Sequence, residues 1–126
     1  MKLVLDTNIL IDKLQGGTKW DEFLSNLDED MEMFLPTTAV FELFSGLSSK
    51  QKSIAEKVNG FRKYFRQVDL TWNIARRAAE IHRDHPQGVE AFDCIIAATA
   101  MEIGAQIVTL NKKHFQKIPG IGVWEK

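Results

Sequence analysis

Short apolar runs alternate with amphipathic helical segments along this chain, and this alternation limits the possible folds more than any other feature of the sequence. Residues 2–5 and 106–109 are predicted to be short buried strands, and further strands are expected at 31–35, 65–70 and, as a possible fifth, 121–124. The expected helices begin at residues 6–8 and run to Leu14, and the later ones are 18–27, 39–45, 49–64, 71–83 and 89–103. Strands that alternate with helices are typical of a parallel sheet covered on both faces. We therefore predict an α/β fold, in which three α/β/α layers surround a central, mostly parallel sheet of four or five strands.

Length and composition restrict the class of protein further. The 126 residues, 44% of them hydrophobic, are enough for one domain with one core, and we expect residues 1–126 to form it. A lone cysteine, Cys94, excludes an intrachain disulfide and fits a reducing compartment. No apolar run approaches the roughly 20 residues of a membrane-spanning helix, and Asp6 comes too early for a signal peptide. We expect a cytoplasmic protein with no membrane partner.

Charge is distributed unevenly along the chain, although the formal net charge is only −1. Residues 1–49 contain three Lys or Arg and nine Asp or Glu, whereas residues 50–83 contain nine and three. The basic segment fits two alternatives: a solvated helix face, or a surface for a polyanion or an acidic partner protein. Composition alone does not choose between them.

Acidic residues stand in segments where packing disfavours them. Asp93 is the only charged residue between Ala91 and Met101, in a predicted helix that is apolar on all sides and therefore buried. Burying an unpaired ionised carboxylate costs roughly several kcal/mol of folding free energy. Asp93 must therefore be protonated, paired or bound to a cation. The alternative is a carboxylate that caps an exposed helix start.

Two further acids repeat this pattern. Glu42 lies within residues 39–44, a short helix otherwise made of residues that we expect in the core, and Asp6 stands where a buried parallel strand meets a helix. That position is the carboxyl edge of the sheet, where ligands bind in α/β folds. If the three acids converge, their mutual repulsion raises their pKa values unless a cation neutralises them. Oxygen donors suit Mg²⁺ or Mn²⁺, and Mg²⁺ sites point to phosphodiester chemistry.

Four motifs follow one another along the chain: residues 5–10 (LDTNIL), Glu42 after Pro36-Thr37-Thr38, residues 93–98 (DCIIAA) and residues 109–111 (TLN). Together they resemble the PIN domain family, and most closely the VapC-type toxins of prokaryotic toxin–antitoxin pairs, and the resemblance covers essentially the whole chain. It implies a Mg²⁺- or Mn²⁺-dependent ribonuclease in which Asp6, Glu42 and Asp93 form the catalytic acidic metal cluster. Asp6 and Asp93 are then the expected direct ligands.

The resemblance also assigns supporting roles. Thr7, Asn8 and Thr109 are expected to position ligands or phosphate groups through hydroxyl and amide hydrogen bonds. Asn111 falls where many members carry a fourth acid, and His114 stands where the pattern often has an Asp. Glu90, three residues before Asp93 and expected on the same helix face, is a candidate to restore an acid to the site.

The leading hypothesis is thus a metal-dependent endoribonuclease that is the toxin of a VapBC-like pair. Attack on the phosphodiester is expected from a metal-activated water, and the candidates for binding the RNA backbone are Lys50, Lys52, Arg62 and Arg66. The implied partners are RNA, a VapB-like antitoxin whose tail uses an apolar groove beside residues 50–66, and a second copy in a homodimer. The alternatives are a PIN nuclease that processes RNA without an antitoxin, and a catalytically inactive PIN-like interaction module.

Other motifs carry less weight. Neither GxGxxG nor GxxxxGK[ST] occurs, so nucleotide binding has no motif support. His82 and His85 fit a solvated helix end better than a metal site, and Cys94 fits the core better than a nucleophile. The three tryptophans, Trp20, Trp72 and Trp124, are expected in the core or at an interface.

Overall fold

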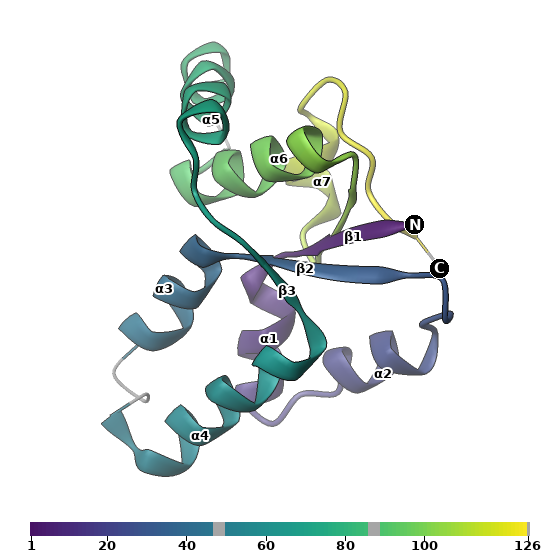
Figure 1. Ribbon diagram of the computed structural model, residues 1–126, viewed down its shortest axis with the longest axis vertical. Coiled ribbons are helices and arrows are strands. Elements are labelled where there is room, and N and C mark those ends of the chain that lie inside the picture. Colours follow the sequence, from purple (N-terminus) through teal and green to yellow (C-terminus); the bar gives the residue numbers. More distant parts are fainter. Residues whose placement is uncertain (47–49, 86–88, 126) are drawn as a thin grey trace.

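Four parallel strands form the centre of the computed structural model, which describes residues 1–46, 50–85 and 89–125 (Figure 1). The strands are β1 (Lys2–Leu5), β2 (Glu32–Pro36), β3 (Arg66–Val68) and β4 (Gln106–Val108), in the order β3-β2-β1-β4. Leu3 of β1 lies opposite Met33 on one side and Gln106 on the other, and every pairing is parallel. The predicted parallel sheet is confirmed.

Helices cover both faces of this sheet. They are α1 (Thr7–Leu14), α2 (Lys19–Ser25), α3 (Thr37–Ser45), α4 (Lys52–Phe61), the 3₁₀ helix η2 (Arg62–Tyr64), α5 (Trp72–Asp84), α6 (Ala91–Ile103) and α7 (Lys112–Gln116). Figure 1 shows α5, α6 and α7 on one side of the sheet and α1 to α4 on the other. The arrangement is the predicted three-layer α/β/α architecture. Among the described helices, each is too short or too polar to cross a lipid bilayer.

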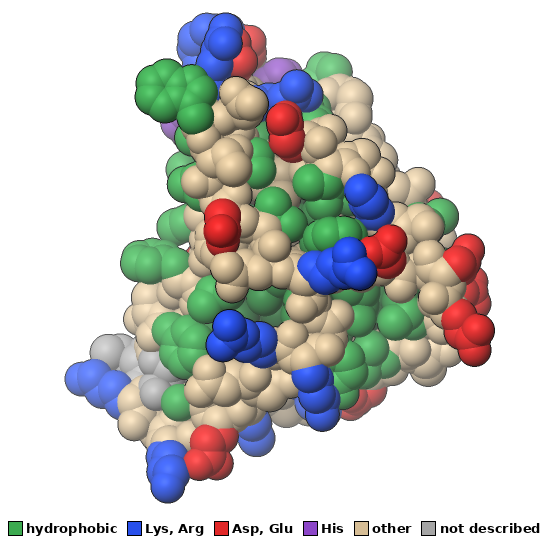
Figure 2. Space-filling model, viewed as in Figure 1, with side chains coloured by type: hydrophobic (Ala, Val, Ile, Leu, Met, Phe, Trp, Pro, Cys, Tyr) green, Lys and Arg blue, Asp and Glu red, His purple; other side chains and the backbone are tan. Residues whose placement is uncertain are grey.

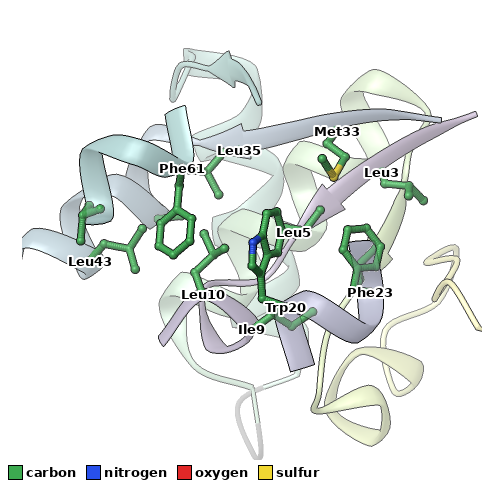
Figure 3. Close-up of a cluster of buried hydrophobic side chains, with 13 residues drawn as sticks. Leu3, Leu5, Ile9, Leu10, Trp20, Phe23, Met33, Leu35, Leu43 and Phe61 are labelled. Atoms are coloured by element: carbon green, nitrogen blue, oxygen red, sulfur yellow. The ribbon is translucent and has the colours of Figure 1, made fainter. Parts of the chain in front are cut away.

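Alternating side chains of β1 explain why both faces are covered. Leu3 and Leu5 belong to one buried cluster, whereas Val4 belongs to the other, because successive side chains of a strand point to opposite faces. Figure 3 shows the first cluster, in which Trp20 of α2 lies among side chains from β1, β2 and α1. The second cluster is built on α6, where Ala97, Ala98 and Ala100 are almost completely buried.

The order of the strands creates a topological switch point between β1 and β4. After β1 the chain enters α1 on one face of the sheet, whereas after β4 it enters α7 on the other face. The two connections diverge beyond the carboxyl ends of β1 and β4. Such a divergence is the place where open α/β sheets bind their ligands.

Local sequence signals account for the ends of several helices. The Thr71 hydroxyl caps α5 by accepting a hydrogen bond from the Ile74 amide at 3.2 Å. Gly104 ends α6 with φ of 69°, a left-handed conformation that glycine adopts at little cost. Both agree with the ends predicted from the sequence.

Some predicted elements differ from the structure. The helix expected at 49–64 becomes α4 and η2, and its first residue lies outside the described residues. Residues 121–124 contribute only one parallel bridge, between Ile107 and Val123, and not a fifth strand. Helix α7 was not predicted, because its five residues hold a single buried apolar side chain, Phe115, and show no helical periodicity.

Fewer side chains of α3 are buried than its sequence predicts. Phe41 is 63% exposed and Phe44 is 39% exposed, although both were expected in the core. Helix α3 packs on α1 and β2 through one side only, so that its other side faces outward. Trp72, the first residue of α5, is also on the surface, whereas Trp20 is buried.

Candidate active site

Asp6 lies at the point where β1 ends and α1 begins. Its backbone amide donates to the Val108 carbonyl at 2.9 Å, which continues the β1–β4 ladder by one residue. The residue is 7% exposed and is the N-cap of α1. The sheet thus holds the Asp6 backbone rigidly at its carboxyl edge.

Thr109 is the hydrogen-bonding centre around Asp6. Its hydroxyl donates to Asp6 Oδ2 at 2.7 Å and accepts from the Asn111 amide at 3.0 Å and from Asn8 Nδ2 at 3.3 Å. The carboxylate of Asp6 is thus held toward the end of β4. Asn8 and Thr109 therefore lie beside Asp6, and their role in positioning ligands or phosphate groups stays a prediction.

Glu42 approaches the same edge from α3. The Thr7 hydroxyl donates to Glu42 Oε1 at 2.9 Å, and this bond joins α1 to α3 across 35 positions of sequence. Burial raises the pKa of Glu42, the Thr7 bond opposes this, and repulsion from Asp6, Asp93 and Glu90 raises the pKa further. Glu42 is therefore close enough to the other three acids to be repelled by their charges.

Asp93 lies in the first turn of α6, with 20% of its side chain exposed. Burial raises its pKa, repulsion from Asp6 and Glu90 adds to this, and a positive charge on His114 opposes it. His114 Nδ1 lies 4.0 Å from Asp93 Oδ2 and 2.7 Å from Asn111 Nδ2. Helix α7 thus lies beside the start of α6.

Glu90 lies just before α6 and not within the helix, as the expected range 89–103 had it. It is the N-cap of α6, with the extended angles φ −78° and ψ 160°, and the helix begins at Ala91. The backbone N–H group of Glu90 donates toward the Asp93 carboxylate three residues later, so the two residues still lie side by side. Glu90 is exposed but lies close enough to raise the pKa of both Asp93 and Glu42.

Burial is also the largest cause of the shifted pKa of Asp6. It raises the Asp6 pKa, while the Thr109 hydroxyl, the amides of Asn8 and Thr7, and His114 act in the opposite direction. Asp6, Glu42 and Asp93 therefore come from three separate elements to one edge, where burial and, for Glu42 and Asp93, repulsion disfavour ionisation. A divalent cation would relieve both effects.

The donor set fits a hard cation only in part. The carboxylate oxygens are ligands that Mg²⁺ and Mn²⁺ accept, and half-buried acids that repel one another need a counter-charge. Within the described residues, however, no three His, Cys, Asp or Glu side chains already stand as ligands of one ion. Mg²⁺ usually keeps several waters and one or two carboxylates, so a complete protein cage is not required.

The four basic residues predicted to bind RNA are spread over the structure. Lys50 and Lys52 lie at the start of α4, and Lys52 is paired with Glu56 at 4.0 Å. Arg66 begins β3 and pairs with Glu32 at 3.5 Å, toward the amino ends of the strands. Arg62 lines a groove between α3 and α4. Their contact with RNA stays a prediction.

The groove beside Arg62 is mostly apolar and has a volume of about 320 Å³. It lies between α3, α4 and the β2–β3 edge of the sheet. Its lining residues are Leu35, Val40, Leu43, Phe44, Val58, Asn59, Phe61, Arg62, Phe65 and Gln67. It coincides with the position where an apolar groove was expected from the sequence.

Two aromatic residues beside the acids were not singled out by the sequence. Phe41 precedes Glu42, Phe92 precedes Asp93, and their rings stack with centroids 5.9 Å apart and planes at 25°. The pair joins α3 to α6 at the surface. In the sequence, only the position of each phenylalanine next to an acid could have indicated this stacked pair. Cys94, in contrast, is 1% exposed and belongs to the core, as predicted.

Fold and site together define a class of protein. The sequence pattern of the PIN domain matches residues 3–121, and this chain belongs to the PIN domain family. Ribonuclease VapC19 of Mycobacterium tuberculosis is 31% identical over 125 residues, which are 96% of this chain and 97% of the relative. Ribonuclease VapC10 of the same species is 28% identical and covers 90% of this chain and 85% of its own length.

Solved structures agree with this fold. The DNA-bound VapBC of Salmonella typhimurium has a TM-score of 0.82 at 25% identity, over 98% of this chain and 97% of that chain. VapBC2 of Rickettsia felis, bound to a promoter fragment, has a TM-score of 0.83 at 22% identity, over 99% of this chain and 100% of that chain. The predicted family and fold are thus confirmed.

The raised pKa values predict how stability depends on pH. For a carboxyl group whose pKa is higher in the folded state, stability is greatest below the ordinary pKa, which is 3.8 for Asp93, and is lost as pH rises through the raised value. In EDTA, we expect Asp93→Asn to be more stable than the wild type at pH 7.5. The difference should shrink toward pH 3, as measured by urea unfolding.

Asp28→Asn is the matched control, because Asp28 is an exposed acid in the turn before β2. It should follow the wild type at both pH values. An Asp93→Asn variant that is less stable than the wild type at pH 7.5 would show that Asp93 is satisfied by its present partners.

Proposed function

We propose that this chain is a metal-dependent endoribonuclease and the toxin of a toxin–antitoxin pair. The observation that supports the proposal is the mutual repulsion of Asp6, Glu42 and Asp93, which lie after β1, on α3 and in the first turn of α6. The relative at 31% identity is named a ribonuclease and aligns along almost the whole chain. A reducing cytoplasm, where RNA is available, suits the buried free thiol of Cys94.

The cofactor in this proposal is Mg²⁺ or Mn²⁺, with Asp6 and Asp93 as its direct ligands and Glu42 beside them. When bound, the ion supplies an acidified water and shields the charge that develops on the phosphodiester. The residues of the chain hold the acids in place: Thr109 fixes one oxygen of Asp6, and Thr7 fixes one oxygen of Glu42. Burial raises the pKa of Glu42, which makes its carboxylate a stronger base. The oxygen that Thr7 leaves free is therefore suited to accept a proton from an attacking water.

RNA is the substrate in this proposal. Hydrolysis of a phosphodiester gives a phosphate monoester and a free hydroxyl, which requires a water activated on one side of the phosphorus. Lys50, Lys52, Arg62 and Arg66 are the candidates for backbone contacts that carry no sequence information. Lys50 and Lys52 are exposed beside the start of α4, where phosphate groups have access to them.

The groove between α3 and α4 is the proposed binding place of the antitoxin tail. VapBC structures of known toxin–antitoxin pairs share this fold, and the groove combines apolar walls with the cation Arg62 at its margin. An amphipathic helix or extended segment that inserts apolar side chains fits such a groove. The antitoxin would then lie on the α3 side of the acidic cluster.

A homodimer is also proposed, through the exposed aromatic side chains of α3, α5 and α6. Phe41 is 63% and Trp72 is 84% exposed, and large apolar side chains seldom stay in water when they gather in one patch. Figure 2 shows apolar side chains that protrude along the left edge of the view, where α3 and α5 lie in Figure 1.

Cleavage of RNA tests the activity directly. We expect the purified chain with MnCl₂ or MgCl₂ to cut total RNA, and EDTA to abolish cleavage. Asp93→Asn should lower the rate by at least about 100-fold, because it removes a charged metal ligand, and should keep the circular dichroism spectrum. Glu80→Gln on α5 removes an exposed acid that is not among the groups acting on the pKa of Asp6, Glu42 or Asp93, and should retain the wild-type rate.

Full activity of Asp93→Asn, or activity in EDTA, would refute the metal-dependent mechanism. A folded wild type that neither cuts RNA nor binds Mn²⁺ would instead favour the inactive interaction module.

Substitution in the groove tests the antitoxin proposal. Asn59 lines the groove and Lys57 does not, although both are exposed residues of α4. With the product of a small gene adjacent to the gene of this chain, Asn59→Trp should weaken binding about tenfold or more because the indole fills the groove. Lys57→Trp should bind like the wild type, and both variants should cut RNA normally. A lack of any adjacent antitoxin gene would favour the nuclease without an antitoxin.

The oligomeric state is measurable by light scattering after gel filtration. We expect the wild type to have twice the 14.4 kDa mass of one chain at micromolar concentration. Phe41→Arg should give monomers, because two guanidinium groups would face each other across the two-fold interface. Ile11→Asp, on the exposed side of α1, should remain dimeric; a dimeric Phe41→Arg would place the interface elsewhere.

A further inference from the structure

A second basic segment lies next to the acidic edge, on the helix that the sequence did not predict. Residues 103–124 contain three lysines and His114 but no Asp or Glu. Two of these lysines, Lys112 and Lys113, are the first residues of α7 and directly precede His114. His114 Nδ1 lies 4.0 Å from Asp93 Oδ2, and α7 lies beside α6 on the same side of the sheet (Figure 1). The two lysines therefore belong to the turn of helix that borders the site.

Helix α7 is fixed in place at both ends. Phe115 is 1% exposed and Ile118 is 2% exposed, and both belong to the core cluster around α6. Before the helix, the Asn111 amide donates to the Thr109 hydroxyl at 3.0 Å, and the same hydroxyl donates to Asp6 Oδ2 at 2.7 Å. The backbone that carries the two lysines is thus tied to the core on one side and to the acidic edge on the other.

Helical geometry turns Lys113 away from the core. Successive residues of a helix are rotated by about 100°, so that Lys113 lies about 200° from Phe115 around the axis. Lys113 is exposed, and Lys112 is half-buried at the side of the helix. Within the described residues neither lysine forms an ion pair with an Asp or a Glu, whereas two of the basic residues expected to bind RNA do. Two ammonium groups beside the site are thereby available to an anion.

An RNA strand that reaches the acids needs positive charge beside them. Ionised Asp6, Glu42 and Asp93 repel phosphate groups, and a single bound cation offsets this repulsion mainly at the phosphate that it contacts. Lysine contacts with phosphates provide an attraction that is independent of sequence. An acidic protein tail would also be attracted by the lysines, but the proposed reaction brings an RNA strand to this edge, where its successive phosphates pass α7.

We propose that Lys112 and Lys113 bind RNA phosphates that flank the one to be cleaved, and that they hold the strand over the acidic edge. The proposal rests on the proposed function, because it concerns the same substrate. These contacts are additional to those proposed for the basic residues of α4, η2 and β3. The acids act at the phosphate that reacts, whereas the lysines contact its neighbours and take no part in breaking the bond.

The salt dependence of RNA binding tests this proposal. For a single strand, each lost phosphate contact lowers the slope of log association constant against log salt concentration by about 0.7. We expect Lys113→Ala to bind a fluorescein-labelled single-stranded RNA about fivefold more weakly at low salt, with a slope reduced by this amount. Lys113→Arg keeps the charge and should restore both values. All variants carry Asp93→Asn, so that the RNA stays intact, and binding is measured by fluorescence anisotropy.

Lys19→Ala is the matched control. Lys19 is the first residue of α2, as Lys112 is of α7, and it is exposed and paired only with Glu22 among the described ion pairs. Its removal takes away the same charge and should leave the RNA affinity and the salt slope as in the Asp93→Asn parent.

Cleavage kinetics of the full chain without Asp93→Asn separates positioning from structure. The double variant Lys112→Ala/Lys113→Ala should raise KM about tenfold or more with kcat nearly unchanged, and should keep the thermal unfolding temperature. An unchanged affinity and slope in this double variant, while the wild type still cuts RNA, would overturn the proposal and leave the proposed function intact.

Three other outcomes would also overturn it. Weaker binding with an unchanged slope would show that the lysines do not contact phosphate. Weaker binding of the antitoxin with unchanged binding of RNA would assign the lysines to an acidic partner protein. A folded wild type that neither binds nor cuts RNA would refute the proposed function together with this inference.

Discussion

The hydrogen bond from the Thr109 hydroxyl to Asp6 joins the ends of two adjacent parallel strands, and the acidic edge depends on it. β1 and β4 end side by side, so one residue beyond each strand suffices to bring the two side chains together. Thr109 then connects Asp6 to Asn8 and Asn111 through the same oxygen. Glu42 on α3 is bound by Thr7, which follows Asp6, and His114 on α7 contacts Asn111.

This arrangement concentrates unfavourable charge where function requires it. Asp6, Glu42 and Asp93 each have a raised pKa because burial disfavours the charged form. The two apolar clusters, one on each side of the sheet, stabilise the fold and offset this cost. Without a cation, ionisation of these acids destabilises the fold at this edge. Such a cost is typical of a binding site for a counter-ion.

The sequence predicted the parallel sheet and most helices, because each depends on local periodicity; the bond between Thr109 and Asp6 was not predicted. It could not predict the outward position of Phe41, since periodicity does not reveal which side of α3 packs on α1. Helix α7 was missed for lack of a repeating apolar pattern in five residues. The place of Glu90 depended on the helix start at Ala91, and helix boundaries are the least certain feature of such predictions. The roles of the site residues and the choice of ion stay predictions.

The alanines of α6 have a consequence for the site. Ala97 and Ala98 are fully buried where α6 packs on β1, and their single methyl groups allow the helix to approach the strand closely. Asp93 lies on this helix and Asp6 directly follows this strand, so the gap between the two acids depends on the smallest side chains in the core. Enlarging one alanine to valine would lift the helix and widen that gap, even though no carboxylate is altered. The spacing of the two acids is therefore determined partly by methyl groups that touch neither of them.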